Sequence, residues 1–507
     1  MKLEQKLERY LLPLVFLFSL GYGLWAAGAG WWNTIMDEHH FRQTQTAMTS
    51  FYMLHGGPFW KYETPVFGPP WSIPFEFPLY QWLAAKVAAL SPIPLEQAGR
   101  LVGKFFYFAA LWPIWSILGN LKIPSRRRLI FLSLYLLSPM YLYWSRCFLI
   151  ESTALFFGLA YLAAAGNLFN DRNRMLSLVS VAILGILAGI IKATSFAVPL
   201  FAAGLWALWS WREKDGKKFP TLSAAKIVDI FFCFAIPLAL TLAWTHFADA
   251  QKHLNPLSEF ITSERLSKWN FGSFQQRISP ATWNMFFRKT IHDSIGHRTT
   301  WIISVVFMLL LRKRWQLYLL GSFLFVLAPM IFTNLHIAHN YYWYANGVFL
   351  IFALGILIVA MLEAKKAWPI LGMIFLISSL LLSIRQYRQF FYYHQTVEEA
   401  AGLATDGALV GAMMPDDGVM LLYGWDWYPG FPYYIKHRAI MNRDVLDLRS
   451  PEMKKIIAAL PPYRLTHLAL CSQNKNPAFL ATLNQQGLQT KFLSHNACDI
   501  YQIISLQ

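Results

Sequence analysis

Apolar segments of roughly 16–22 residues recur along the chain, separated by short basic or aromatic stretches. A helix of about that length crosses the roughly 30 Å hydrocarbon core of a bilayer, where lipid offers no partner to an irregular backbone. Charged residues make up 14% of the chain and hydrophobic residues 56%, which is too little charge for a typical soluble enzyme. The sequence therefore predicts a polytopic α-helical membrane protein.

We expect about eleven membrane spans. The first apolar segment is too long for a secretory signal and lacks a cleavage site, so we interpret it as a retained span. The predicted spans lie near residues 11–32, 101–119, 129–145, 149–169, 176–191, 195–211, 226–247, 299–311, 316–333, 341–362 and 367–384.

The net charge of +17 comes mainly from Lys and Arg in short loops between apolar segments. That distribution is the positive-inside pattern, which favours contact with anionic lipid and argues against a nucleic-acid partner. The basic N-terminus (Lys2, Lys6, Arg9) is expected in the cytoplasm. Alternation of the spans then places the other basic loops there too: Lys122/Arg126/Arg127/Arg128, Arg172/Arg174, Arg212/Lys214/Lys217/Lys218, Arg312/Lys313/Arg314 and Lys365/Lys366.

The opposite face receives a long first loop, 33–100, in which 41–54 and 79–90 have the pattern of interfacial helices. It also receives a C-terminal segment, 385–507, with strand-like runs at 419–423, 468–471 and 500–504 and helical patterns at 397–412 and 451–460. We therefore expect a transmembrane domain over 1–384 and a small extracytoplasmic α/β domain over 385–507. Cys471 and Cys498 fall in that domain and either form a disulfide or stay as thiols.

Topology gathers particular residue types on this outer face. Asp37 and Glu38 follow the first span, and His39, His40 and Arg42 come directly after them. Paired carboxylates beside a bilayer are costly and mark candidate sites. A carboxylate can act as a general base, and cations can stabilise a departing phosphate. The other outer-face residues of these types are Glu63, Glu76, Arg146, Glu151, Lys192, His336, His339, Tyr341 and Tyr342.

This pattern resembles the membrane-embedded GT-C glycosyltransferases, in particular the protein O-mannosyltransferase and lipid A aminoarabinose transferase branch (glycosyltransferase family 39/83). Asp37-Glu38 matches the acidic pair that opens the family's first outer loop, and Phe75-Glu76-Phe77-Pro78 is similar to its later acidic-proline motif. That match departs from the family at Phe77, where Lys or His is common, and at Leu79, where a second Pro is common. Three further stretches are similar to family motifs: Arg146 to Glu151, Gly189 to Thr194 and His339 to Tyr342.

The resemblance implies transfer of a sugar from a polyprenyl-phosphate donor to an unidentified acceptor (protein, lipid or glycan), with inversion at the anomeric carbon. In that reaction Asp37 is the base, and Glu38 and Glu76 orient it or the acceptor. Arg146, Lys192, His339 and Tyr342 hold the donor phosphate, supported by His40, Arg42, Glu151 and Tyr341. If a divalent metal ion takes part, Asp37, His39 and Glu76 are its expected ligands.

Other interpretations stay open from sequence. Arg146 and Glu151 could pair with each other, Lys192 could extend to the interface, and His336 and His339 could be interfacial residues without a role. A lipid-linked glycan ligase or polymerase would use a similar site. A transporter or flippase would also carry membrane charges, but the two halves of the chain show no internal repeat.

Overall fold

The computed structural model describes residues 7–216, 221–397, 401–495 and 497–506. Lys2, Lys6, Lys217 and Lys218, which entered the charge argument, lie outside these residues, as do residues 398–400 of one predicted helix. The chain forms two compact units, each built from distant segments. The first unit comprises Met1–Trp31, Arg100–Trp244 and Ser267–Thr396, and the second comprises Trp32–Gly99, Thr245–Leu266 and Val397–Gln507.

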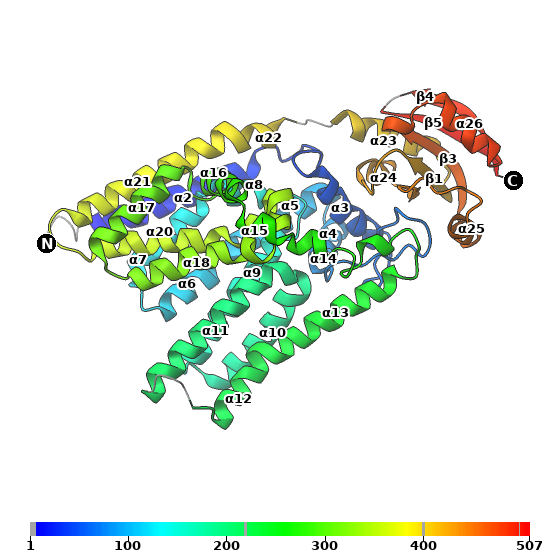
Figure 1. Ribbon diagram of the computed structural model, residues 1–507. Coiled ribbons are helices and arrows are strands. Elements are labelled where there is room, and N and C mark those ends of the chain that lie inside the picture. The colour runs from blue at the N-terminus through cyan, green and yellow to red at the C-terminus, as the bar shows by residue number, and fades with distance from the viewer. Residues whose placement is uncertain (1–6, 217–220, 398–400, 496, 507) are drawn as a thin grey trace. The chain divides into compact units, whose positions relative to one another are not determined.

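The first unit is a helical bundle (Figure 1). The longer helices that lie wholly in this unit are α2 (Leu12–Gly28), α6 (Leu111–Asn120), α7 (Ser125–Leu136), α9 (Glu151–Phe169), α10 (Arg174–Ile191), α11 (Ala193–Asp215), α16 (Pro280–Ile295), α17 (Arg298–Leu311), α18 (Trp315–Ile331), α20 (Gly347–Leu362) and α21 (Trp368–Gln386). Two more helices belong to both units: α5 (Leu95–Ala109), which enters the first unit at Arg100, and α13 (Ile236–Lys252), which leaves it after Trp244. The short helices of the first unit are α8 (Pro139–Trp144), α12 (Ala224–Ile230), α14 (Ser267–Phe271), α15 (Phe274–Ile278), α19 (Thr333–Ala338) and α22 (Tyr392–Thr396). Turns of π-helix cover Leu7–Leu11, Phe231–Ala235 and Tyr387–Phe391, and a 3-10 helix covers Asn340–Ala345.

Among the described residues, seven helices are long and apolar enough to cross a membrane. They correspond to the predicted spans near 11–32, 101–119, 149–169, 176–191, 195–211, 226–247 and 367–384. The predicted span 299–311 lies in α17, which forms a pair with α16 bent by 90°. The predicted spans 316–333 and 341–362 contain the shorter apolar helices α18 and α20. The chain is thus a multi-pass membrane protein, as the sequence predicts.

The predicted span 129–145 is wrong as a single helix, because α7 ends at Leu136 and α8 begins at Pro139. Proline lacks the N–H that a continuing helix needs, and it disfavours helical backbone at the preceding residue. Ser138 is accordingly extended (φ −63°, ψ 124°).

The second unit combines the first outer loop with the C-terminal segment. It contains α3 (His40–Leu54), α4 (Leu79–Leu90), α23 (Ala401–Met413), β1 (Gly418–Tyr423), α24 (Gly430–Ile435), β2 (Arg438–Met441), α25 (Pro451–Ala458), β3 (Arg464–Cys471), α26 (Pro477–Gln485), β4 (Leu488–His495) and β5 (Cys498–Leu506). Single 3-10 turns lie at Glu259–Ile261 and Ser472–Asn474. The helices and three strands predicted here are present, whereas β2 and β4 were not predicted.

The strands form a mixed five-stranded sheet in the order β2-β1-β3-β5-β4. β1 runs parallel to β2 and β3, and β5 runs antiparallel to β3 and β4. In the β3–β5 register Cys471 faces Cys498, and the two form a disulfide. This settles the alternative that the sequence left open.

Residues 65–68 of the first loop lie along the outer edge of β2. The amides of Ala439 and Met441 donate to the carbonyls of Pro65 (2.9 Å) and Val66 (2.7 Å). Such pairing covers an edge strand that would otherwise expose unpaired backbone groups. The loop that carries Asp37 is therefore part of the same folded unit as the C-terminal sheet.

Candidate functional site

The predicted site residues divide between the two units. Asp37, Glu38, His39, His40, Arg42 and Glu76 belong to the second unit, and Arg146, Glu151, Lys192, His339, Tyr341 and Tyr342 belong to the first. That both sets act on one substrate stays a prediction, and each set is described by itself.

Asp37 lies three residues before the start of α3 and is only 6% exposed. Its carbonyl accepts the backbone N–H of His40 (3.0 Å), and its carboxylate accepts a hydrogen bond from the side-chain amide of Gln43. The same amide also donates to the carbonyl of Glu38 (3.0 Å). The N-terminus of a helix favours a negative charge, and a buried carboxylate needs hydrogen-bond donors. Gln43, one turn along the helix, therefore orients the carboxylate, a role that sequence reasoning missed.

Glu76 pairs with Arg42, which comes from the first turn of α3. The guanidinium of Arg42 also lies 5.9 Å from the ring of Phe75 and donates to Gln45. The sequence predicted that these two residues share a face, and within the second unit the structure brings them into contact.

Lys252 also lies in this group, and sequence reasoning did not select it. Its ammonium is 5.0 Å from the ring centre of Phe75, pairs with Asp249 (3.1 Å), and is close enough to Glu76 to interact electrostatically. Lys252 ends a long helix far along the chain, so no local pattern marks it.

The acidic and histidine side chains in the described part of the chain are not arranged as a set of metal ligands. Within the part of the chain that the structure describes, no group of three or more His, Cys, Asp or Glu side chains is placed to hold a metal ion. The expected ligands Asp37, His39 and Glu76 do not gather in such a group, and two of them are engaged by Gln43 and Arg42. We therefore derive no step through a metal ion.

In the first unit, Lys192 is the single residue between α10 and α11, and its backbone is extended (φ −160°, ψ 92°). This break turns the side chain inward, where it is 3% exposed and pairs with Glu151, the first residue of α9. Its ammonium lies 4.1 Å from the ring centre of Tyr342 and 5.4 Å from that of Tyr341. Lys192 is thus a buried cation held by one carboxylate and two aromatic faces.

Two histidines flank the aromatic pair. The ring of His339 stacks on Tyr341 with centres 5.2 Å apart. His336 is buried, with its ring nitrogens next to the carbonyl of Phe332 (2.8 Å) and the amide of Asn346 (3.0 Å). Burial, together with a smaller effect of the nearby Lys192 charge, lowers the pKa of His336 to about 4. His336 is therefore a neutral residue at physiological pH and does not add a cation to the site.

Arg146 lies in the turn between α8 and α9 and is 2% exposed. Its guanidinium is 5.8 Å from the ring of Tyr143. Lys104 on α5 lies close enough for the two charges to repel, and its ammonium donates to the carbonyl of Leu142 (3.1 Å) and the hydroxyl of Ser145 (2.9 Å). Two buried basic side chains therefore lie close together, and sequence reasoning did not select Lys104.

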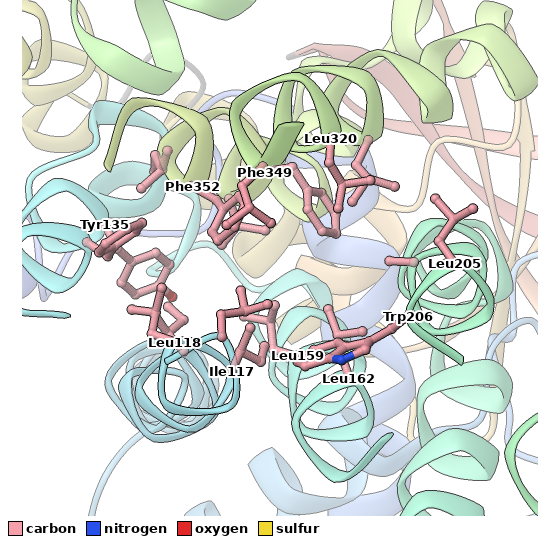
Figure 2. Close-up of a pocket in the computed structure, with 18 of the residues that line it drawn as sticks. Ile117, Leu118, Tyr135, Leu159, Leu162, Leu205, Trp206, Leu320, Phe349 and Phe352 are labelled. Atoms are coloured by element: carbon pink, nitrogen blue, oxygen red, sulfur yellow. The ribbon is translucent and has the colours of Figure 1, made fainter. Parts of the chain in front are cut away.

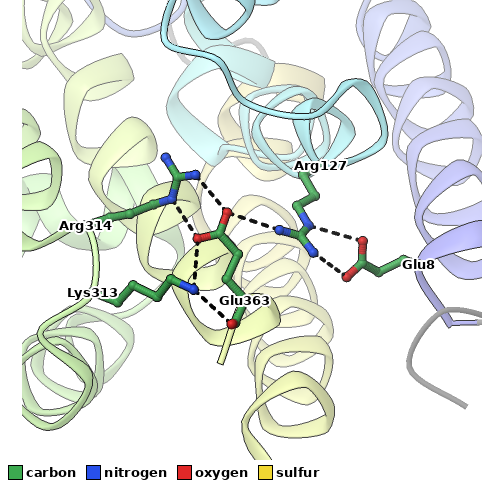
Figure 3. A network of polar contacts seen from close by, with 5 residues as sticks. All are labelled: Glu8, Arg127, Lys313, Arg314 and Glu363. Carbon is green, nitrogen blue, oxygen red and sulfur yellow. Dashed lines mark hydrogen bonds and ion pairs between the residues drawn. The ribbon is translucent and has the colours of Figure 1, made fainter. Parts of the chain in front are cut away.

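The other end of the bundle carries a separate charge network (Figure 3). Glu363 accepts from Arg127 (3.1 Å) and Arg314 (2.7 Å) and pairs with Lys313, and Arg127 also binds Glu8 (2.9 Å). Glu363 follows α20, whereas His339 precedes it, so about 24 Å of helix separates them. The N-terminal segment and three of the loops predicted to be cytoplasmic thus meet at one end of the bundle, whereas Lys192 and His339 lie toward the other.

An apolar pocket in the first unit is lined by α6, α7, α9, α11, α18 and α20 (Figure 2). Leu159, Leu162, Leu205 and Trp206 face it. Leu205 is thirteen residues beyond Lys192 on α11, which is about 20 Å along the helix. The wall of the pocket is almost entirely apolar, and its Leu205 side lies apart from Lys192.

Comparison with solved structures identifies the fold. ArnT from Cupriavidus metallidurans bound to undecaprenyl phosphate matches with a TM-score of 0.61 and 13% identity, over 97% of this chain and 98% of that one. The archaeal oligosaccharyltransferase AglB from Archaeoglobus fulgidus, in complex with an inhibitory peptide and a dolichol-phosphate, matches with a TM-score of 0.55 and 11% identity, over 91% and 69%. The mycobacterial arabinofuranosyltransferase AftD matches with a TM-score of 0.52 and 13% identity, over 97% and 41%.

No protein-family description matches the sequence, and no curated protein matches it. The chain nevertheless has the GT-C fold of membrane-embedded glycosyltransferases, as the resemblance implied.

Proposed function

We propose that this protein is a membrane glycosyltransferase that moves a sugar from a polyprenyl-phosphate donor to an acceptor hydroxyl or similar nucleophile. The observation that carries the proposal is the GT-C fold, shared over almost the whole chain with a structure bound to undecaprenyl phosphate. The sugar and the acceptor are not part of the proposal.

Asp37 is the proposed base. It removes the proton from the acceptor hydroxyl while the acceptor oxygen attacks the anomeric carbon, and the bond from that carbon to the donor phosphate breaks with its electron pair on the phosphate. Attack opposite the leaving group inverts the anomeric carbon. Glu38 and Glu76 orient the base or the acceptor, and His40 and Arg42 support them. The hydrogen bond from Gln43 to Asp37 and the ion pair between Arg42 and Glu76 support these roles.

The donor phosphate is assigned to Arg146, Lys192, His339 and Tyr342, with Glu151 and Tyr341 in support. Buried cations are favourable where a phosphate leaves with its charge, because they act in a medium of low dielectric constant. The burial of Lys192 beside Tyr342 and the proximity of Lys104 to Arg146 support a polyanionic ligand.

We further propose that the chemistry takes place on the extracytoplasmic face. The transmembrane catalytic domain would span 1–384 and the α/β domain 385–507. The disulfide between Cys471 and Cys498 supports this orientation, because such bonds persist in oxidising compartments. The contact of Arg127 and Arg314 through Glu363, at the bundle end away from His339, agrees with it.

A lipid-linked glycan ligase or polymerase is the second candidate. The likeness to an oligosaccharyltransferase over 91% of this chain favours it. The two proposals differ in the donor, which would carry one sugar or an oligosaccharide. None of the three structural matches described above is a transporter, so the transporter interpretation has no similar support.

The test is sugar transfer from radiolabelled polyprenyl-phosphate donors by the purified protein and its Asp37→Asn and Asp37→Ala variants. Loss of a general base typically lowers the rate about 10²–10⁴-fold, and we expect that loss in both variants. Asp171→Asn serves as the control, because Asp171 is an exposed surface carboxylate paired with Lys214. Transfer at the wild-type rate in both Asp37 variants would exclude Asp37 as the base.

A further inference from the structure

The loop after β1, residues 424–429, occupies a position in the sheet where open α/β folds bind ligands. β1 lies between β2 and β3 and is parallel to both. After β1 the chain forms β2 on one side of it and then crosses over to form β3 on the other side, so the strand order reverses at β1. Ligands bind outside the carboxyl ends of strands at such a reversal. Gly424 fixes the loop, because it has φ +98° and a Cβ there would lie 1.8 Å from the carbonyl oxygen of Cys471.

The loop carries two aromatic side chains toward the residues around Asp37, within the same unit. Trp427 stacks on Phe75 with ring centres 5.6 Å apart and meets Phe41 edge-on at 5.1 Å. Tyr428 meets His40 edge-on at 5.3 Å. Phe41 and His40 form the first turn of α3, which begins three residues after Asp37, and Phe75 precedes Glu76.

Charged groups lie on the open side of the same loop. The Asp426 side chain is 65% exposed and pairs with Arg443 (3.0 Å), which comes from the loop after β2. The guanidinium of Arg443 lies 3.9 Å from the ring centre of Phe260. The half-buried indole of Trp427 therefore lies near an exposed hydrogen-bond acceptor, Asp426, and a partly buried donor, Arg443, whose side chain is 28% exposed.

This combination fits a carbohydrate ring. A pyranose has an apolar C–H face that packs on an aromatic ring, and hydroxyls around its edge that donate to a carboxylate and accept from a guanidinium. A lipid chain would use only the aromatic faces. An extended peptide that added a strand at the sheet edge next to this loop would meet residues 65–68, which already occupy the edge of β2.

We propose that residues 424–429 and Arg443 form an acceptor subsite for a carbohydrate, one of whose hydroxyls is the nucleophile. This rests on the proposed function. The acceptor proton goes to the Asp37 carboxylate, the acceptor oxygen bonds to the anomeric carbon, and the polyprenyl phosphate leaves with the electron pair of the broken bond. Trp427, Asp426 and Arg443 bind and position the acceptor and take no part in these bond changes.

The experiment measures binding directly. Saturation-transfer NMR is recorded on the full-length protein in phosphatidylethanolamine–phosphatidylglycerol nanodiscs with a mixture of methyl α-D-mannopyranoside, methyl β-D-galactopyranoside and methyl N-acetyl-β-D-glucosaminide. The tetrapeptide Gly-Ser-Thr-Gly is the competing probe. We expect saturation of glycoside ring protons with the wild type, and a loss of at least fivefold in Trp427→Ala and Asp426→Asn.

Asp417→Asn is the matched control. Asp417 precedes β1 as Asp426 follows it, is also exposed, and also pairs with an arginine, Arg464 (2.7 Å). It lies at the amino end of the strand, so its replacement should leave the signal unchanged. Asp426→Asn changes an exposed group and keeps the subsite testable if Trp427→Ala fails to fold.

Absence of glycoside saturation with the wild type, unchanged saturation in Asp426→Asn, or saturation of the peptide alone would overturn the acceptor proposal. None of these results concerns Asp37, whose role is tested by sugar transfer. The subsite can therefore fail while the proposed function stands. If sugar transfer fails instead, glycoside saturation would show carbohydrate binding alone, without an acceptor role.

Discussion

At the scale of single residues, the structure shows how a buried carboxylate is given one orientation. Asp37 cannot rotate freely, because Gln43 donates to its side chain from one helical turn away and is itself 1% exposed. Orientation of a reacting group contributes strongly to rate, since small misplacements lose the reactive geometry. Gln43, which directly follows Arg42, belongs to no recognisable motif, and sequence reasoning gave it no role.

Gln43→Leu keeps the size of this side chain and removes its hydrogen bonds. We expect the rate of sugar transfer at saturating donor to fall at least about tenfold, in line with the known sensitivity to misplacement. Affinity for undecaprenyl phosphate should stay unchanged, because the donor phosphate is assigned to residues of the other unit. Gln489→Leu, at an exposed position of β4, is the control. An unchanged rate in Gln43→Leu would remove the positioning role.

The lowered pKa of His336 should make the stability of the folded protein depend on pH. Its pKa is lowered to about 4 by burial, whereas an unfolded histidine has a pKa of about 6.5. Between these values the unfolded chain binds the proton and the folded chain does not, so stability falls as the pH decreases from about 6.5 to about 4. His336→Gln should flatten the decrease in Tm over this range relative to wild type, measured in detergent micelles. Parallel curves for the two proteins would contradict the assignment.

At the scale of elements, the break between α10 and α11 is the feature that brings a cation into the bundle. In a continuous helix the direction of the Lys192 side chain would follow the helical periodicity, whereas the extended backbone at this residue directs it to Glu151 at the start of α9. Breaking a buried ion pair on one side leaves an uncompensated charge and costs about 3–5 kcal/mol, while replacing both partners is often nearly neutral.

Glu151→Gln should therefore lower the Tm clearly, and the double variant Glu151→Gln/Lys192→Met should recover most of it. Binding of undecaprenyl phosphate should be weakened in the double variant all the same, because the phosphate loses its cation. Lys289→Met, at an exposed position of α16, is the control for loss of one positive charge. Recovery of both stability and donor binding in the double variant would show that Lys192 has a structural role alone.

The sequence predicts a helix or strand well only where the element is long and its apolar residues follow a clear period. Long apolar segments predict the spans of the first unit well, but Pro139 divides one of them. The sequence does not predict β2, because its four residues are too few to show a strand pattern. It does not predict β4, because most side chains of that strand are at least partly exposed. The ion pair between Arg42 and Glu76 and the position of Lys252 depend on tertiary packing, which neither periodicity nor motif spacing contains.

At the scale of the whole molecule, the chain builds each unit from segments that are far apart in sequence. The first outer loop and the C-terminal segment are joined by backbone pairing at β2 and by Arg438. This guanidinium pairs with Glu63 (2.6 Å) and lies 4.7 Å from the ring of Tyr52 and 4.6 Å from that of Tyr463. The C-terminal segment therefore supports the fold of the loop that carries the proposed base.

Arg438→Met tests this support without touching any residue that has a proposed chemical role. The variant leaves Glu63 part-buried without its guanidinium, which should cost about 2–3 kcal/mol, since both side chains are less than one-fifth exposed. We expect faster proteolysis within residues 55–78 and a proportional loss of sugar transfer. Arg464→Met, which breaks an exposed pair with Asp417, should change neither. If the first loop of Arg438→Met resists proteolysis as well as that of the wild type, the first loop and the C-terminal segment fold independently. In that case the C-terminal segment would contribute to sugar transfer only by binding the acceptor.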